Sequence, residues 1–280
     1  MRIALATYKE PAGPCDRSLL AALSEIAHDA RSAVWSDSAR NWRAFDAVVI
    51  RSCWDYHLHA DQFLAWIASL EEARIPVINP PALIRWNATK AYLKELEAAG
   101  IAIPGSVVVP EGTEEDVASL CTQRRWQKAV VKPLVSASAH RTERRTSGVV
   151  PGPALIQEYI AAIETEGEFS LTFIDHEYSH AVNKKPRAGD FRVQEEHGGT
   201  IVAAQPPAGA QSFAERVLAA MPCRSTYARV DLVNDRGQLR LMELEVIEPE
   251  LYLHLALGSA HKLAMAISEE LQKASSATQH

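Results

Sequence analysis

The sequence predicts a mixed α/β fold with three lobes, because the character of the chain changes twice along its length. Strands and helices alternate over residues 1–80, which is typical of a parallel sheet covered by helices. From about residue 155, alternating strands joined by short turns are typical of antiparallel hairpins. Short strands around one helix lie between these two regions. With 280 residues, the chain is long enough to bury a core without disulfides.

The first lobe is expected to be a small parallel sheet with its ligand contacts at one edge. Apolar runs predict strands over residues 2–7, 33–35 and 46–52, and PVINP (76–80) predicts a fourth. Leucines and isoleucines at helical spacing predict helices over residues 18–30 and 61–73. The segment RSCWDY (51–56) follows the third strand, where an open parallel sheet normally contacts its ligand.

The rest of the chain is expected to contain a small central lobe and a hairpin-rich C-terminal lobe. Helices are predicted over residues 89–99, from Thr113, over 208–220 and over 259–273. SVVV (106–109), AVVKP (129–133) and LIQEYI (155–160) read as strands, and residues 169–185 as a hairpin that turns at Asp175-His176. His176 and His180 flank that turn and are expected to be exposed. The resulting division is 1–85, 86–155 and 156–280.

Composition excludes several classes of protein. The formal net charge of −6 makes binding of nucleic acid through a general positive field improbable. The basic run HRTERR (140–145) has no interleaved aromatic residues for base stacking. The N-terminus does not resemble a signal peptide, and no apolar run reaches the roughly 20 residues of a membrane span. The four cysteines are widely spaced, so we expect a cytoplasmic protein without disulfides or a zinc site.

The strongest chemical signal is a set of three carboxylates on the last predicted hairpin. Glu243 and Glu245 are two residues apart on one strand and therefore project from the same face. If the hairpin is symmetric about Gly237, Asp231 lies opposite Glu243. Oxygen ligands on a rigid sheet suit Mg²⁺ that also holds phosphate oxygens. A solvated acidic strand face is the alternative that the spacing alone leaves open.

Two lysines in apolar surroundings give a second signal. Lys132 follows the apolar run 129–131, and Lys90 lies near the start of a helix. A buried ammonium group needs an anion, and phosphate oxygens would provide it. Small residues after Lys132 (LVSASAHRT) have backbone N–H groups that would close over phosphates. For either lysine alone, a side chain that reaches solvent is the simpler interpretation.

These signals, in this order, resemble the ATP-grasp superfamily over roughly residues 85–255, especially D-alanine–D-alanine ligase and bacterial glutathione synthetase. The resemblance implies an ATP-grasp fold, with an N-terminal α/β domain, a small central lid and a C-terminal antiparallel sheet that carries the metal site. It implies that Lys90 and Lys132 contact ATP phosphates and that Glu168 holds the ribose. The adenine hinge would be Gln157, Glu158, Tyr159 and Ile160.

The same resemblance implies a metal site and anion contacts. Asp231, Glu243 and Glu245 would be the Mg²⁺ ligands, with Glu245 in place of the usual asparagine. Arg229 would contact an anion, and Arg192 in GDFRVQEEHGG (189–199) would neutralise a phosphate or an acyl phosphate. Gln194 replaces the asparagine that usually follows this arginine by two residues. Homodimers are common in the superfamily, so the resemblance leaves a homodimer open.

Three segments are also similar to the cyclo-ligases that close O-ureidoserine to cycloserine: RSCWDY, NKKPRAGDFRVQEEHGG and ELEVIEP. This likeness implies a small amino-acid substrate. The substrate pocket would comprise the residues Arg51, Ser52, Trp54, Asp55, Tyr56, Lys185, Arg192 and Glu248. In it, Asp55 or Glu248 would hold an α-ammonium group and an arginine the carboxylate.

The function implied by the resemblance is an ATP- and Mg²⁺-dependent carboxylate–amine ligase that forms an acyl phosphate. Lys185, Arg192 and Arg229 would assist the transfer by neutralising charge. Three alternatives stay open at this point: a ligase of another small substrate or dipeptide, a small-molecule kinase, and a module that binds nucleotide without turnover.

Overall fold

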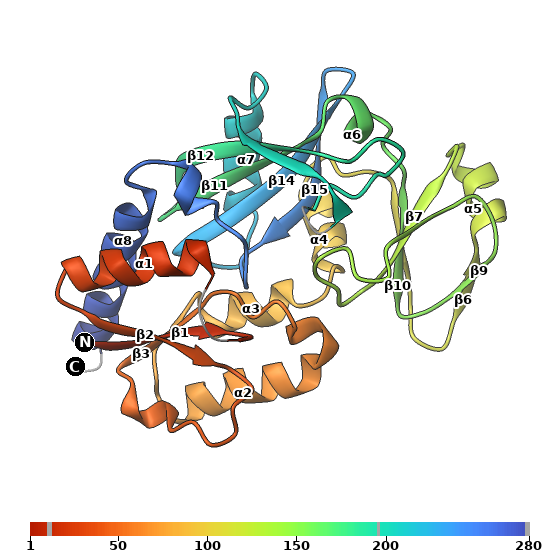
Figure 1. Ribbon diagram of the computed structural model, residues 1–280. Coiled ribbons are helices and arrows are strands. Elements are labelled where there is room, and N and C mark those ends of the chain that lie inside the picture. Colours follow the sequence, from red (N-terminus) through yellow and green to blue (C-terminus); the bar gives the residue numbers. More distant parts are fainter. Residues whose placement is uncertain (10–12, 195–196, 278–280) are drawn as a thin grey trace.

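The computed structural model describes residues 1–9, 13–194 and 197–277, which form three lobes (Figure 1) with a hollow between them. The N-terminal sheet has the parallel order β2-β1-β3-β4. Its strands are β1 (Arg2–Thr7), β2 (Asp29–Val34), β3 (Ala47–Ile50) and β4 (Val77–Ile78). Its flanking elements are α1 (Pro14–Glu25), η1 (Trp42–Ala44), η2 (Tyr56–Leu58), α2 (Ala60–Glu72) and α3 (Pro81–Asn87).

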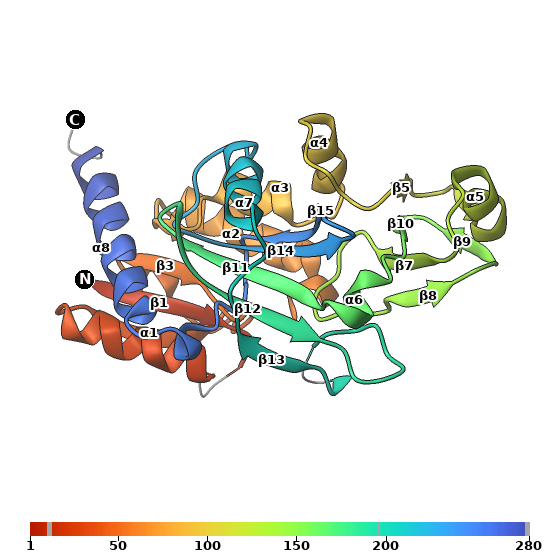
Figure 2. The same ribbon diagram turned by 90° about the horizontal axis from the view of Figure 1, so that it is seen from above.

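Alternating apolar residues give this sheet two buried faces. Ile3 and Leu5 of β1 face α1, whereas Ala4 and Ala6 face the core that Phe63 of α2 helps to form. The C-terminal helix α8 (Ser259–Ala277) returns to this lobe and packs against α1 (Figures 1 and 2). The end of the chain therefore completes the N-terminal core. This differs from the division made from the sequence, which placed the whole of residues 156–280 in the last lobe.

The central lobe carries a four-stranded sheet of order β5-β10-β7-β8 and a two-stranded sheet β6-β9. Its elements are β5 (Ser106–Val109), β6 (Glu114–Asp116), α5 (Val117–Arg124), β7 (Ala129–Pro133), β8 (Glu143–Arg145), β9 (Val149–Pro151) and β10 (Ala154–Glu158). The helix expected from Thr113 begins at Val117 because the Asp116 carboxylate accepts the backbone N–H of Ser119 as an N-cap. This lobe projects to one side of the molecule (Figure 2).

The C-terminal lobe is an antiparallel sheet of order β13-β12-β11-β14-β15. Its elements are α6 (Ala162–Thr165), β11 (Glu168–Ile174), β12 (Glu177–Lys185), β13 (Thr200–Ala203), α7 (Ala210–Ala219), β14 (Tyr227–Asp235), β15 (Gln238–Glu245) and η4 (Leu253–Leu255). The expected turn at Asp175-His176 is confirmed. Its two faces differ, because Val230 and Leu232 face the core while Arg229 and Asp231 face the hollow.

One predicted helix has a different place from the one expected. The segment predicted as a helix over 89–99 forms α4 (Tyr92–Ala98), and its Tyr92, Leu93 and Leu96 pack with Phe213 of α7 in the core of the C-terminal sheet. The helix therefore supports the last lobe, although the division at residue 86 assigned it to the central one.

The helix expected over 18–30 lies over 14–25, because Pro14 starts it early and Ala27 has a positive φ of 63°.

Candidate active site

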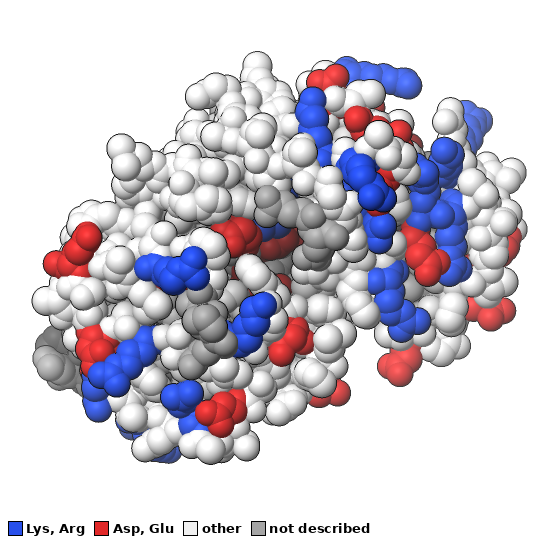
Figure 3. All heavy atoms as spheres, viewed as in Figure 1, with Lys and Arg blue, Asp and Glu red and all other residues white. Residues whose placement is uncertain are grey.

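A cavity of about 610 Å³ lies where the three lobes meet. Figure 3 shows acidic side chains at the bottom of this hollow, while lysines and arginines are concentrated over the neighbouring central lobe. The cavity wall includes both predicted lysines, the predicted hinge and the three predicted carboxylates of the last hairpin. Residues from distant parts of the sequence therefore line one cavity.

The last hairpin presents its charged residues as pairs. Asp231 lies opposite Glu243, as predicted, and Arg229 lies opposite Glu245. The turn and the strand pairing that produce this register differ from those of the symmetric hairpin that the sequence suggested. Asp235 pairs with Gln238 around a two-residue turn, and a bulge between Asp231 and Leu232 then shifts the pairing by one. Without that bulge, Met242 would face Asp231.

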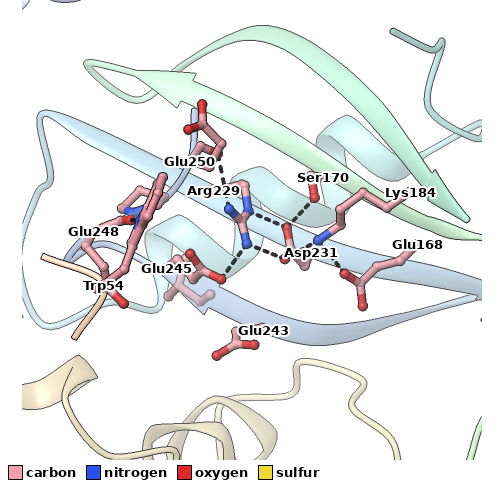
Figure 4. Close-up of polar contacts among 12 residues, drawn as sticks. Trp54, Glu168, Ser170, Lys184, Arg229, Asp231, Glu243, Glu245, Glu248 and Glu250 are labelled. Atoms are coloured by element: carbon pink, nitrogen blue, oxygen red, sulfur yellow. Dashed lines mark hydrogen bonds and ion pairs between the residues drawn. The ribbon is translucent and has the colours of Figure 1, made fainter. Parts of the chain in front are cut away.

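Asp231 is the centre of a buried ion network (Figure 4). Its carboxylate accepts hydrogen bonds from Ser170 Oγ at 2.7 Å, Lys184 Nζ at 2.9 Å and two nitrogens of Arg229 at 2.9 Å each. Burial opposes the charge of Asp231, but Arg229 and Lys184 outweigh it, so the pKa of Asp231 lies well below its usual range. The oxygens of Asp231 are thus already occupied by groups of the chain.

Lys184 is the site residue that the sequence reasoning missed. Its ammonium group lies 2.5 Å from Glu168 and 2.9 Å from Asp231, and only 4% of the residue is exposed. Lys185, which was predicted instead, is exposed and lies outside the cavity wall. A bulge between Thr172 and Phe173 explains the difference, because it changes the pairing of β11 and β12 by one residue. A shift of one residue in the pairing of a strand moves each of its side chains to the opposite face of the sheet.

Glu243 and Glu245 remain open to the cavity. Glu243 pairs with Lys90 and Glu245 with Arg229, yet their side chains keep 31% and 23% of their surface exposed. Burial raises the pKa of Glu245 to about 7; Arg229 counteracts this rise, while Glu243 and Asp231 add to it. For Glu243, burial is outweighed by Lys90 and Lys132, which lower its pKa. These two carboxylates are accessible to a ligand in a way that Asp231 is not.

The predicted phosphate and hinge residues line the other end of the cavity. Lys90 is buried, and its backbone N–H donates to Leu134 O at 2.8 Å, which ties the helix start to the loop after β7. Burial, together with the charge of Lys90, lowers the pKa of Lys132 to about 8. The N–H of Glu158 already donates to Gly105 O at 2.7 Å, so the main chain of Glu158 has no free donor for a base.

The remaining predicted nucleotide and phosphate residues also lie on the cavity wall, namely Gln157, Tyr159, Ile160, Glu168 and Arg192. Gln157 donates to Ser106 Oγ at 3.0 Å, and Arg144 lies over the Tyr159 ring, 5.2 Å from its centroid. Arg192 pairs with Asp190 at 2.8 Å and keeps 36% of its side chain exposed. Residues 195 and 196 of the segment that carries Arg192 lie outside the described residues.

Only half of the six predicted substrate residues from RSCWDY and ELEVIEP reach the cavity. Trp54, Tyr56 and Glu248 line it, whereas Arg51, Ser52 and Asp55 do not. The carboxylate of Asp16 binds both Arg51, at 3.3 Å, and Ser52, at 2.5 Å. Asp55 accepts the indole N–H of Trp35 at 2.7 Å. These three predicted residues support the wall from behind.

Comparisons with known proteins agree with the fold. Residues 3–79 match the family model described as D-cycloserine synthetase DcsG, N-terminal domain. The structure of D-alanine–D-alanine ligase from Bacillus anthracis in complex with ATP is similar with a TM-score of 0.67 and 16% identity, covering 98% of each chain. The glutathione synthetase of Prochlorococcus marinus (strain MIT 9313) is 28% identical over 144 residues, which is 46% of this chain and 44% of that protein. The chain thus has the ATP-grasp fold and is an enzyme homologous to ATP-grasp ligases.

A more particular likeness extends over almost the whole chain. The cycloserine biosynthesis protein DcsG of Streptomyces lavendulae is 28% identical over 282 residues, which cover 91% of this chain and 93% of that protein. The crystal structure of D-cycloserine synthetase DcsG superposes with a TM-score of 0.84 at 27% identity, covering 97% of this chain and all of that one. The chain is therefore homologous to D-cycloserine synthetase along its length. No helix in the described ranges combines the length and hydrophobicity needed to cross a bilayer.

Proposed function

We propose that the protein is an ATP- and Mg²⁺-dependent carboxylate–amine ligase that acts on a small amino-acid-like substrate through an acyl phosphate. One observation carries the proposal: four cations, Lys90, Lys132, Lys184 and Arg229, surround carboxylates in one cavity between three lobes. Such a site suits the positioning and neutralisation of a triphosphate. The homology to ligases, D-cycloserine synthetase among them, favours a carboxylate as the phosphoryl acceptor.

The donor set fits a magnesium ion that is shared with phosphate. Within the described residues, no three His, Cys, Asp or Glu side chains converge as a closed metal site. Mg²⁺ typically takes one or two carboxylates and completes its shell with phosphate oxygens and water. Glu243 and Glu245 are accessible and would supply those carboxylates, while Asp231 would hold Lys184 and Arg229 in place. When bound, Mg²⁺ would neutralise charge on the triphosphate.

The reaction needs no covalent nucleophile from the chain. A substrate carboxylate oxygen attacks the γ-phosphorus, the bond to the β–γ bridging oxygen breaks, and ADP leaves. An amine nitrogen then attacks the acyl carbon, phosphate leaves, and the amine loses a proton to give an amide. Lys90, Lys132 and Arg192 line the cavity where negative charge would develop, so their role is electrostatic. By homology to D-cycloserine synthetase, we propose that O-ureidoserine is the first substrate to test.

The test is release of ADP from MgATP in the presence of small amino acids, including O-ureidoserine, with and without hydroxylamine. A ligase should release ADP only when a carboxylate substrate is present, and hydroxylamine should trap a hydroxamate. A kinase that phosphorylates a hydroxyl group would release ADP without any hydroxamate. Binding of MgATP without ADP release across the panel would contradict both enzymatic functions.

The low pKa of Lys132 predicts a pH dependence for nucleotide use. In the free enzyme, Lys132 carries its charge below about pH 8 and loses it above, because burial and Lys90 disfavour the ammonium form. ATP is an anion, so kcat/KM for MgATP should fall about tenfold between pH 7 and pH 9. Lys132→Arg keeps its charge over this range and should flatten the profile. An unchanged fall in Lys132→Arg would assign the titration to another group.

A further inference from the structure

Four successive backbone carbonyls beside the cavity are each held by side chains from other elements. They belong to residues 248–251, here called the acidic segment, which follows β15. The donors are Trp54 to Glu248 O at 3.0 Å, Arg51 to Pro249 O at 3.1 Å, Arg229 to Glu250 O at 3.1 Å, and Thr172 and His180 to Leu251 O at 3.3 and 2.8 Å. A carbonyl only accepts, so His180 donates from Nε2. His180, expected to be exposed, is half-buried in this role.

Such anchoring fixes the backbone of the acidic segment before any ligand binds. The donors come from the loop after β3, from β11, from β12 and from β14, so three of the four anchoring elements belong to the C-terminal sheet and one to the N-terminal lobe. Side chains carried by a fixed backbone lose little conformational entropy when they bind a ligand. The acidic segment is therefore built as a preorganised part of the cavity wall.

Glu248 differs from the other carboxylates of the site. Asp231, Glu168, Glu243 and Glu245 each form an ion pair with a lysine or arginine. Among the described residues, no Lys, Arg or His lies within ion-pairing distance of Glu248, although only 7% of it is exposed and it lines the cavity. A buried carboxylate without a cation is costly, and a cation brought by a ligand would remove that cost.

The surroundings of Glu248 suit a small cation. Trp54 lines the cavity next to Glu248, and its indole is fixed by the hydrogen bond to Glu248 O (Figure 4). An aromatic ring beside a carboxylate adds a cation–π attraction for an ammonium group. Glu250 is less suited, because its Oε1 already accepts the backbone N–H of Tyr252 at 2.9 Å. Glu248 and Glu245 line the same cavity, three residues apart in the chain.

We propose that the Glu248 carboxylate receives a primary ammonium group of the substrate, so that the enzyme takes small carboxylic acids with an amino group near the reacting carboxylate. This inference rests on the proposed function, which supplies the carboxylate chemistry. It selects Glu248 over Asp55, whose carboxylate is engaged by Trp35 behind the wall. It also gives Arg51 a positioning role, through the carbonyl of Pro249.

The experiment compares two probes that differ in one group, O-ureidoserine in both enantiomers and 3-(ureidooxy)propanoate, which lacks the amino group. Calorimetric titration in the presence of MgADP measures the affinity of each probe without requiring turnover. Wild-type protein should bind one enantiomer of the amino probe about 100-fold more tightly than the desamino probe. Glu248→Gln should reduce that ratio to below about tenfold by weakening the amino probe alone.

The matched control is Glu250→Gln, which should keep the wild-type ratio. Unchanged affinity of Glu248→Gln for MgATP, together with an unchanged melting temperature, would show that the variant is folded. An equal loss for both probes in Glu248→Gln would overturn the proposal, as would a wild-type protein that binds no α- or β-amino acid better than its desamino partner. Failure of the proposed function is a separate result, because it appears as absent ADP release while the binding ratio is still measured.

Discussion

Replacing Lys184 with methionine should lower the free energy of unfolding by about 3–5 kcal/mol and abolish ADP release. The substitution leaves Glu168 and Asp231 buried, with Arg229 as the remaining cation beside Asp231. Burial disfavours the ammonium form of Lys184, but Asp231 and Glu168 outweigh it and raise its pKa above the ordinary value, which shows how strongly the carboxylates depend on this charge. Denaturant unfolding and the ADP-release assay measure the two effects.

The adjacent lysine provides the control for this prediction. Lys185→Met removes the same charge from an exposed position on the opposite face of β12, so it should change stability by no more than about 0.5 kcal/mol. ADP release should stay near the wild-type rate. Equal effects of the two substitutions would show that net charge matters rather than the buried network. A larger effect of Lys185→Met would contradict the register of β12.

Replacing Glu245 with glutamine should have opposite effects on the affinities for MgADP and for magnesium-free ADP. The variant should bind MgADP at least tenfold more weakly, because a carboxylate ligand of the metal is lost. It should bind magnesium-free ADP more tightly, because a negative charge beside the phosphates is gone. Glu243→Gln should show the same pattern, with an added loss of stability because its partner Lys90 is buried. Titrations of ADP with and without Mg²⁺ measure both quantities.

A pH series sharpens the Glu245 test. The pKa of Glu245 is raised to about 7 by burial and by its acidic neighbours, so the wild-type affinity for Mg²⁺ should fall as pH drops through 7 and the carboxylate is protonated. Glu245→Gln should lose this dependence. If the two nucleotide forms change in parallel in Glu245→Gln, the residue does not ligate the metal.

Much of the site was predictable, because its residue types indicate its chemistry even where the expected backbone register is wrong. The sequence placed Asp231 opposite Glu243 by assuming symmetry about Gly237, yet the turn is centred between Arg236 and Gly237 and a bulge supplies the missing residue. For β12, the bulge near Thr172 brings Lys184 rather than Lys185 to the cavity, whereas the likeness to the cyclo-ligases had suggested Lys185. Bulges leave no clear mark in residue spacing, so strand parity beyond them was not predictable.

The substrate end was harder to predict for a different reason. Arg51, Ser52 and Asp55 have the residue types expected of a binding site, but they are used to hold other parts of the chain. A buried arginine that supports a carbonyl and one that binds a carboxylate have the same sequence signature. The distinction depends on which way the loop after β3 turns, and only the packing of α1 and the acidic segment against it determines this.

Two adjacent lysines, Lys184 and Lys185, end β12 and make the site tolerant of a one-residue change in the register of that strand. If β12 paired with β11 without the bulge, Asn183 would lie opposite Glu168, and Lys185 would project from the face that Lys184 occupies now. A cation would still stand near Glu168 and Asp231. The strand therefore carries a second lysine next to its most important charge, and a one-residue change in its register would be less damaging than in a strand with a single lysine.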